Sequence, residues 1–263
     1  HFLILGWNRK AIPILTHLAE LDEKLRVVIL SATDPEIVRS ELRRRYRNLK
    51  GLKALPLQGS IASAGELTRI ALKKAAYVIV LAEGLGMKNS FSDVTTIKTL
   101  MLISAKLSSV KKPNIVAEIV DTDKLSIANI VSGMQHPIVS SGQIISKMIV
   151  QCARYPGYSA VYSELFSIKK TTMQVAKVNH KEGDTFGEIA CRVSNGTAIG
   201  ISWIKTENGK SRRVTILNPE PDFDLAEEDE IIVISDINIP LEINSKNRVS
   251  SSRENQAEKG GAQ

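Results

Sequence analysis

Short apolar runs alternate with helically spaced apolar residues over about the first 140 residues. Phe2–Leu5 is an uncharged run that ends at Gly6, and Ile12–Leu18 has apolar positions at helical spacing. A second uncharged run, Val27–Leu30, stops at small polar residues. This order of strand, glycine turn, helix and strand is the opening unit of a doubly wound nucleotide-binding fold.

The same alternation continues along the chain. Further strands are expected at Leu52–Leu57, Tyr77–Leu81, Asn114–Val120 and His136–Val139. Helices are expected from Asp34, from Ser63 to about Ala75, from Ser92 to Leu107, and from Asp121. Because parallel strands need helical crossovers, residues 1–140 are predicted to form an α/β domain with a Rossmann-like doubly wound parallel sheet.

Residues 141–168 are expected to form crossover helices that pair domains. Ser140 begins a capping pattern, and the helix behind it, to about Ala153, is apolar over more than one stripe. Such a helix is covered on more than one side, either by its own domain or by a second subunit. We expect Ile145, Met148 and Ile149 to contact the counterpart helix of a neighbouring domain.

Residues 169–240 have a different pattern, which predicts a small α+β lobe. Thr185–Glu188 fits a capping box, and Asn208-Gly209 is a strong hairpin turn. Strands are expected at Met173–Val178, Thr197–Ile204, Arg213–Leu217 and Glu230–Ser235. The tail, 241–263, is rich in Ser, Lys, Glu and Gly and is expected to have little fixed structure.

The net charge of +7 is concentrated in part of the chain. Residues 35–53 hold seven basic and two acidic residues, whereas residues 218–230 hold seven acidic residues and no basic one. The basic segment is either a solvated outer face or a surface for anionic lipid or an acidic partner. The sequence has no apolar run long enough to span a membrane. Cys152 and Cys191 lack metal-ligand spacing, which indicates a reducing compartment.

The turn after the first strand is the candidate ligand site. The glycine positions of a dinucleotide fingerprint hold Gly6, Asn8 and Ala11, and the second strand ends without an acid. Asn8 can adopt the positive φ of such a turn. The alternative is a turn that only joins a strand to a helix. If the cleft binds a nucleotide, its mouth is expected at the strand ends around the switch point, lined by Gly6, Asn8, Arg9, Ser31, Gly59, Ser60 and Ala82.

A candidate calcium site follows the fifth strand. Glu118, Asp121 and Asp123 lie at its carboxyl end, and calcium prefers such oxygen ligands. The alternative is that these acids cap a helix and face solvent. The acidic stretch Glu220–Glu230 is a second candidate for calcium.

The chain resembles a regulator-of-potassium-conductance (RCK) domain, most closely the first such domain of Castor- and Pollux-type ion channels. The resemblance covers roughly residues 1–240. It rests on His1–Trp7, Glu118–Asp123 and Lys147–Gly157, and more broadly on Asn218–Pro221.

The resemblance implies regulation of a channel. It implies a homo-oligomer with paired domains in a ring below a tetrameric pore, and a pore segment that precedes this chain. Because His1 opens directly onto the first strand, we expect a fragment of a longer, membrane-associated protein. Ligands of the family include calcium, NAD and other nucleotides. The missing acid after the second strand argues against NAD.

Three alternatives come from other classes. An NAD(P)-dependent oxidoreductase needs an acid–base group, and the Tyr-x-x-x-Lys pair available is Tyr46 and Lys50 in the basic segment. Since no other catalytic signature is present, we expect no enzyme. A nucleotide-sensing regulatory subunit of a potassium transporter would share the fold. Nucleic-acid binding through residues 39–53 lacks a recognised motif, so no nucleic-acid partner is expected.

Overall fold

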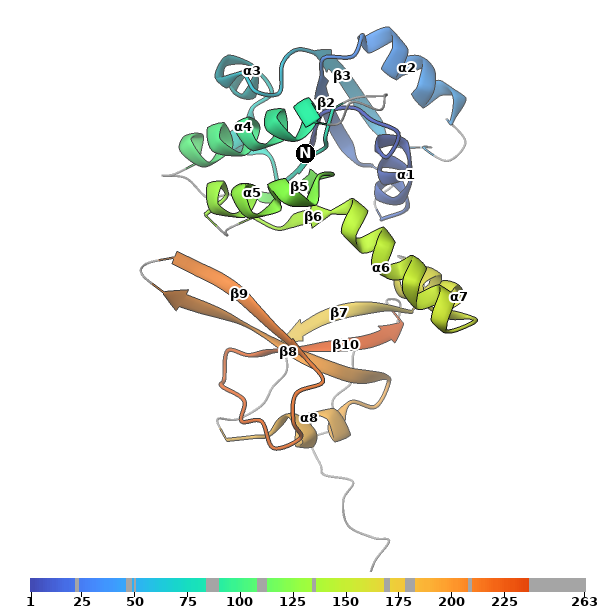
Figure 1. The fold of residues 1–263 in the computed structure, drawn as a ribbon, viewed down its shortest axis with the longest axis vertical. Coiled ribbons are helices and arrows are strands. Elements are labelled where there is room, and N and C mark those ends of the chain that lie inside the picture. The colour runs from blue at the N-terminus through green and yellow to red at the C-terminus, as the bar shows by residue number, and fades with distance from the viewer. Residues whose placement is uncertain are drawn as a thin grey trace, which may run out of the picture. The chain divides into compact units, whose positions relative to one another are not determined.

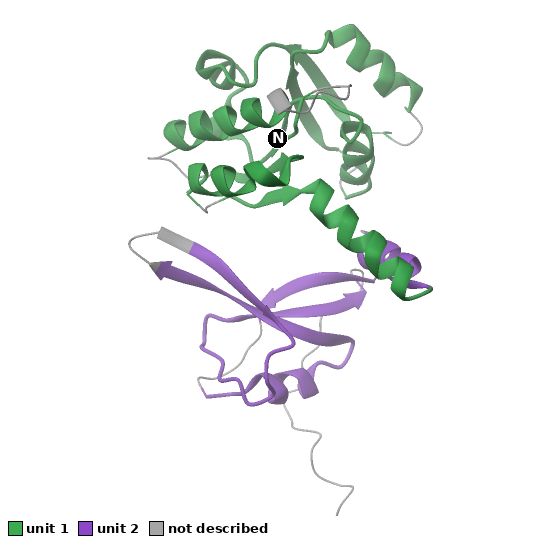
Figure 2. Ribbon diagram, viewed as in Figure 1, with its two compact units in different colours: residues 1–156 green, residues 157–263 purple. Residues whose placement is uncertain are grey.

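The chain forms two compact units in the computed structural model, residues 1–156 and residues 157–263 (Figure 2). The boundary falls inside the segment predicted to hold the crossover helices. The structure describes residues 1–21, 24–45, 49, 51–83, 90–107, 113–133, 136–167, 171–177, 183–207 and 210–236. The predicted tail and the Asn208-Gly209 turn lie outside these residues.

The first unit is built on a six-stranded sheet in the order β3–β2–β1–β4–β5–β6 (Figure 1). Every neighbouring pair is parallel. The strands are β1 (Phe2–Leu5), β2 (Arg26–Ser31), β3 (Lys53–Gln58), β4 (Tyr77–Val80), β5 (Asn114–Ile119) and β6 (Ile138–Ser140). The strand order reverses between β1 and β4, which makes this the topological switch point. The predicted Rossmann-like fold is confirmed.

Helices connect these strands. They are α1 (Ala11–Leu21), α2 (Pro35–Arg44), α3 (Ala64–Arg69), α4 (Ser90–Lys106), α5 (Leu125–Val131) and α6 (Ser141–Arg154), with 3₁₀ turns η2 (Leu72–Lys74) and η3 (Thr122–Lys124). Asp34 and Ser63 cap α2 and α3 as expected, because each side chain accepts a backbone N–H of the first turn. Helix α3 ends before the predicted Ala75, since Ala71 is left-handed. Ser140 precedes α6 but makes no side-chain capping bond.

Alternation along β1 divides the first unit into two cores. Leu3 and Leu5 pack with Leu100 of α4 on one face, whereas Ile4 packs with Leu15 of α1 on the other. All five side chains are fully buried. Successive side chains of a strand point to opposite faces, so a strand covered by helices on both faces must be apolar throughout.

The second unit contains the predicted α+β lobe, preceded by α7 (Tyr158–Leu165) of the predicted crossover segment. Its sheet is antiparallel, in the order β7–β10–β8–β9. Thr185 and Glu188 form the expected capping box, which places Phe186 and Ile189 in the core of this unit. The elements are α7 (Tyr158–Leu165), β7 (Thr171–Lys177), α8 (Phe186–Arg192), β8 (Gly196–Glu207), β9 (Lys210–Leu217) and β10 (Glu230–Asp236).

Two neighbouring residues of α4 test the core of the first unit. Leu100→Ala removes a fully buried side chain, so it should lower the free energy of unfolding by about 2–5 kcal/mol. Met101→Ala is the control, because Met101 is 55% exposed and its loss should cost under about 0.5 kcal/mol. Urea denaturation of both variants measures the difference. Equal losses would place Leu100 outside the core.

Candidate functional site

Gly6 has a steric role at the carboxyl edge of the parallel sheet. Its φ is +98°, and a Cβ added there would lie 2.3 Å from the carbonyl oxygen of Leu81. Its N–H donates to the carbonyl of Leu30 at 2.8 Å. Only glycine combines this conformation with such a close approach of the chain after β4. The turn therefore needs a glycine whether or not a ligand binds.

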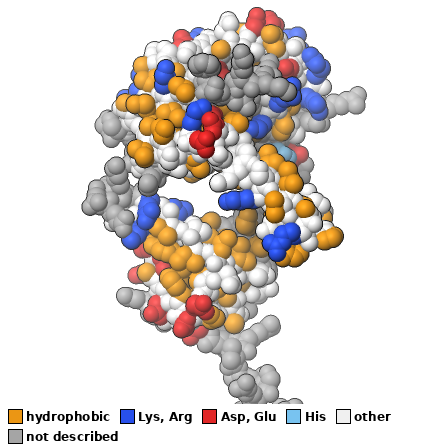
Figure 3. Space-filling model, in the orientation of Figure 1, with side chains coloured by type: hydrophobic (Ala, Val, Ile, Leu, Met, Phe, Trp, Pro, Cys, Tyr) orange, Lys and Arg blue, Asp and Glu red, His pale blue; other side chains and the backbone are white. Residues whose placement is uncertain are grey.

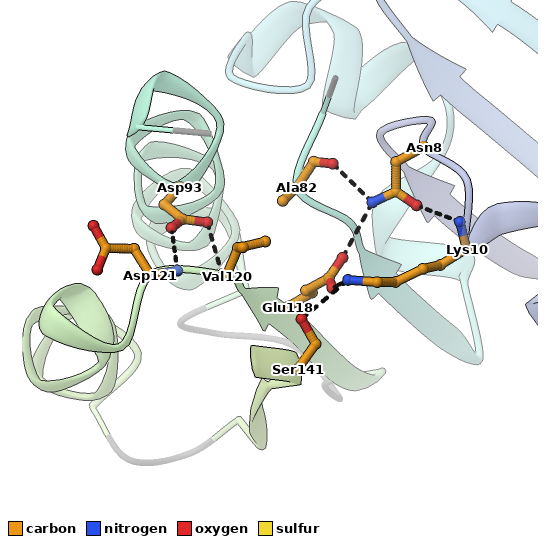
Figure 4. A network of polar contacts seen from close by, with 8 residues as sticks. All are labelled: Asn8, Lys10, Ala82, Asp93, Glu118, Val120, Asp121 and Ser141. Carbon is orange, nitrogen blue, oxygen red and sulfur yellow. Dashed lines mark hydrogen bonds and ion pairs between the residues drawn. The ribbon is translucent and has the colours of Figure 1, made fainter. Parts of the chain in front are cut away.

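Asn8 connects this turn to two neighbouring strands. Its buried side chain donates from Nδ2 to the carbonyl of Ala82 at 2.8 Å and to Oε2 of Glu118 at 3.1 Å (Figure 4). Its Oδ1 accepts the N–H of Lys10 at 2.9 Å. Asn8 does not take the positive φ considered for it, since Ala71 and Asn218 are the non-glycine residues with positive φ in the described ranges. Its polar atoms instead link the turn after β1 to Ala82, after β4, and to Glu118 of β5.

Glu118 is the centre of this edge. It is 6% exposed, and its carboxylate pairs with the ammonium of Lys10. The same ammonium donates to Oγ of Ser141 at 3.0 Å (Figure 4). A buried carboxylate requires such partners, because it has lost its hydration. The Lys10–Glu118–Ser141 contacts therefore join the start of α1, the end of β5 and the first residue of α6.

Asp93 organises the segment that follows β5. This residue of α4 is fully buried. Its carboxylate accepts the backbone N–H groups of Val120 at 3.1 Å and Asp121 at 2.8 Å (Figure 4). The sequence analysis missed Asp93, although it is the lone acid of its helix.

The three acids proposed for calcium are not brought together. Asp121 caps η3: it pairs with the Lys124 ammonium at 3.1 Å and accepts the N–H of Asp123 at 3.1 Å, and both contacts lower its pKa. Its side chain points away from Glu118 (Figure 4). No group of three His, Cys, Asp or Glu residues that could hold a metal ion occurs in the described part of the chain, which includes Glu220–Glu230. Calcium binding stays a prediction.

Glu83 lies beside the Gly6 turn. Its Oε1 accepts the N–H of Ala32, just after β2, at 2.9 Å. Its Cγ would lie 3.2 Å from a Cβ at Gly6. Burial raises the pKa of Glu83, and the Ala32 N–H partly opposes this. A phosphate at the turn would therefore meet a carboxylate.

Of the other predicted cleft residues, Ser31, Gly59 and Ser60 lie at the end of β2 or just after β3, whereas Arg9 follows the Gly6 turn. Ser31 and Gly59 lie at the same edge, but Ser31 is 1% exposed, and a Cβ on Gly59 would lie 2.5 Å from the Glu66 carboxylate. Ser60 is exposed just after β3. Arg9 is exposed and lines a cavity between α1 and α2, which Asn8 also lines.

Removing the Lys10 ammonium should show how much the buried Glu118 carboxylate depends on its counter-charge. Lys10→Met is expected to lower the free energy of unfolding by about 1–3 kcal/mol, because the carboxylate stays buried without its ion pair. Adding Glu118→Gln should restore most of this loss, since the amide carries no charge. Urea denaturation of the single and double variants gives the coupling free energy between Lys10 and Glu118. Purely additive losses would contradict the role given to this pair.

Glu83→Gln should change the pH dependence of stability. Because the folded-state pKa of Glu83 is raised above 4.5, the folded state binds more protons than the unfolded state between the two pKa values. The ionised side chain therefore becomes increasingly destabilising as pH rises above about 4.5, and it costs nothing at lower pH. The variant should melt like the native chain at about pH 4 and a few degrees higher at about pH 7. Equal melting differences at both pH values would contradict this.

The chain is similar to known ion channels over most of its length. Residues 142–250 match the family described as "Castor and Pollux, part of voltage-gated ion channel". The chain is 25% identical over 239 residues to "Probable ion channel CASTOR" of Oryza sativa subsp. japonica, and 26% identical over 242 residues to "Probable ion channel POLLUX" of Arabidopsis thaliana. Each alignment covers 90% of this chain, but the chain spans only 26% and 28% of these relatives.

A solved structure shares the fold. The human SLO3 gating ring superposes with a TM-score of 0.61 at 18% identity, over 89% of this chain and 44% of that one. Across the described residues, no helix has both the length and the apolar content to cross a membrane. The matched family and the channel relatives confirm the resemblance of this chain to Castor- and Pollux-type ion channels, and the gating-ring structure confirms the expected fold.

Proposed function

We propose that the chain is a regulatory domain of a ligand-gated cation channel and couples ligand binding to the opening of a pore elsewhere in the protein. The observation that carries this proposal is the uncovered apolar surface of α6. No residue of α6 is buried. Ile145 is 52% exposed and Ile149 is 63% exposed. The space-filling view shows hydrophobic side chains gathered along this helix (Figure 3).

A second copy of the chain is the proposed cover for α6. Ile145, Met148 and Ile149 share one side of the helix, because residues three and four apart lie above one another. Contiguous exposed apolar surface on a folded domain marks an interaction site. A pair of α6 helices would bury this surface and would be the unit from which a ring of domains is built below a pore.

The polar edge of the sheet offers a route from a ligand to α6. Lys10 contacts both Glu118 and the first residue of α6. A ligand that moves Lys10 or Glu118 would therefore shift the start of the assembly helix. Such a ligand can gate a pore only if it binds the open and closed assemblies with different affinity. A nucleotide or calcium is the ligand class proposed.

Channel regulation is favoured over catalysis. The curated relatives are named as ion channels. The oxidoreductase alternative depends on Tyr46 and Lys50, which lie outside the described residues. Hydride transfer by the purified chain, tested with NADH and a panel of carbonyl substrates, would favour that alternative.

A charge placed on the apolar side of α6 should weaken assembly. Ile149→Glu would bury an unpaired carboxylate in the pair, so the dissociation constant should rise by at least about tenfold. Gln143→Glu is the matched control, because it adds the same group on the opposite side of the helix. Sedimentation equilibrium measures both. A native chain that stays monomeric at high concentration, even with its pore attached, would contradict the proposed pair.

The channel function needs a measurement on the full-length protein. Ion flux through the reconstituted channel should change when calcium or a nucleotide is added, both in native protein and in Gln143→Glu. Ile149→Glu should reduce that dependence. A ligand response that is unchanged in Ile149→Glu, although its assembly is weakened, would show that pairing through α6 does not gate the pore.

A further inference from the structure

A cavity lies between α1 and α2, and it adjoins the polar edge of the sheet at Asn8. It has a volume of about 620 Å³. Cavities of this size hold small molecules. The polar side chains that line it include Arg9, Thr16, His17, Glu41, Arg44 and Arg45. Apolar groups of Ile12 and Pro13 complete the α1 wall.

The charge of this cavity is predominantly positive. Arg9, Arg44 and Arg45 line it, and none of these guanidinium groups has a carboxylate partner in the part of the chain that the structure describes. Elsewhere in the same unit, Arg39 pairs with Glu36 and Arg69 pairs with Glu66. Within the described residues, the cavity therefore gathers three arginines without carboxylate partners, one just before α1 and two at the end of α2.

Among the described residues that line the cavity, Glu41 supplies the one carboxylate, and it has a structural partner. Oε2 of Glu41 accepts the indole N–H of Trp7 at 3.1 Å, and Trp7 is 1% exposed. This bond holds Glu41 against the core. One carboxylate cannot neutralise three guanidinium groups, so the cavity keeps a positive potential for a ligand.

We propose that the cavity binds a small anion with closely spaced phosphate groups. Guanidinium groups bind phosphate oxygens through paired, charge-assisted hydrogen bonds, and three of them suit more than one phosphate. A soluble polyphosphate and the headgroup of a phosphoinositide share this chemistry. Binding at this cavity does not depend on the proposed gating function, and Arg44 and Arg45, at the end of α2, can be changed without altering the Gly6 turn.

The proposal is tested by calorimetric titration of the chain with inorganic pyrophosphate and with inositol trisphosphate. The double variant Arg44→Gln/Arg45→Gln should bind at least one of these probes about tenfold more weakly or worse, because charged hydrogen bonds are lost. Arg43→Gln is the matched control: this neighbouring residue of α2 does not line the cavity, and binding should be unchanged. Thermal melting verifies that all variants fold.

Vesicle sedimentation distinguishes the two sources of phosphate. Retention on vesicles with phosphatidylinositol bisphosphate, but not with phosphatidylserine, assigns the cavity to a lipid headgroup. Binding of the soluble probes without vesicle retention assigns it to a free polyphosphate. No binding of either soluble probe to the native chain would overturn the proposal. An equal loss in Arg43→Gln would also overturn it, because it would indicate diffuse attraction to a basic helix.

Discussion

The carboxyl edge of the parallel sheet depends on a buried carboxylate. Glu118 has lost its water, and in the low-dielectric interior it is held by the Lys10 ammonium and the Asn8 amide. These partners start α1, while Ser141, which starts α6, shares the same ammonium. The contacts of this one acid and its counter-charge thus link the starts of two helices. Asn8, at a position where a dinucleotide fingerprint carries glycine, works as an internal bridge.

Other carboxylates occupy backbone donors at the same edge. Glu83 accepts the N–H of Ala32 after β2, and Asp93 accepts the N–H groups of Val120 and Asp121 after β5. In open α/β sheets these strand ends are where ligands bind. An anion at this edge would have to displace protein carboxylates. The arginine-lined cavity between α1 and α2 imposes no such cost, because its positive groups are not already neutralised.

The fold could be predicted from the sequence, whereas the pairings at the site could not. Apolar runs and helical spacing identified every strand of the first sheet, and local capping chemistry identified Asp34, Ser63 and Thr185. The early end of α3 was missed because a left-handed Ala71 has no sequence signature. Glu118 was placed at the correct edge, but its partner Lys10 is 108 residues away. Glu83 and Ala32 are 51 residues apart. No local pattern reveals such contacts, since they form only after the strands assemble.

Ser141, the first residue of α6, connects this exposed helix to the polar edge of the sheet. A helix is a rigid element, so a displacement of its first turn by Lys10 reaches Ile145 and Ile149 without any change in its own hydrogen bonds. The start of α6 contacts the polar edge of the sheet through Ser141, and its exposed apolar side is the surface that the proposed second copy would cover. Linkage makes this connection reciprocal. If a ligand at the edge changes the affinity of the α6 pair, pairing must change the affinity for the ligand by the same factor.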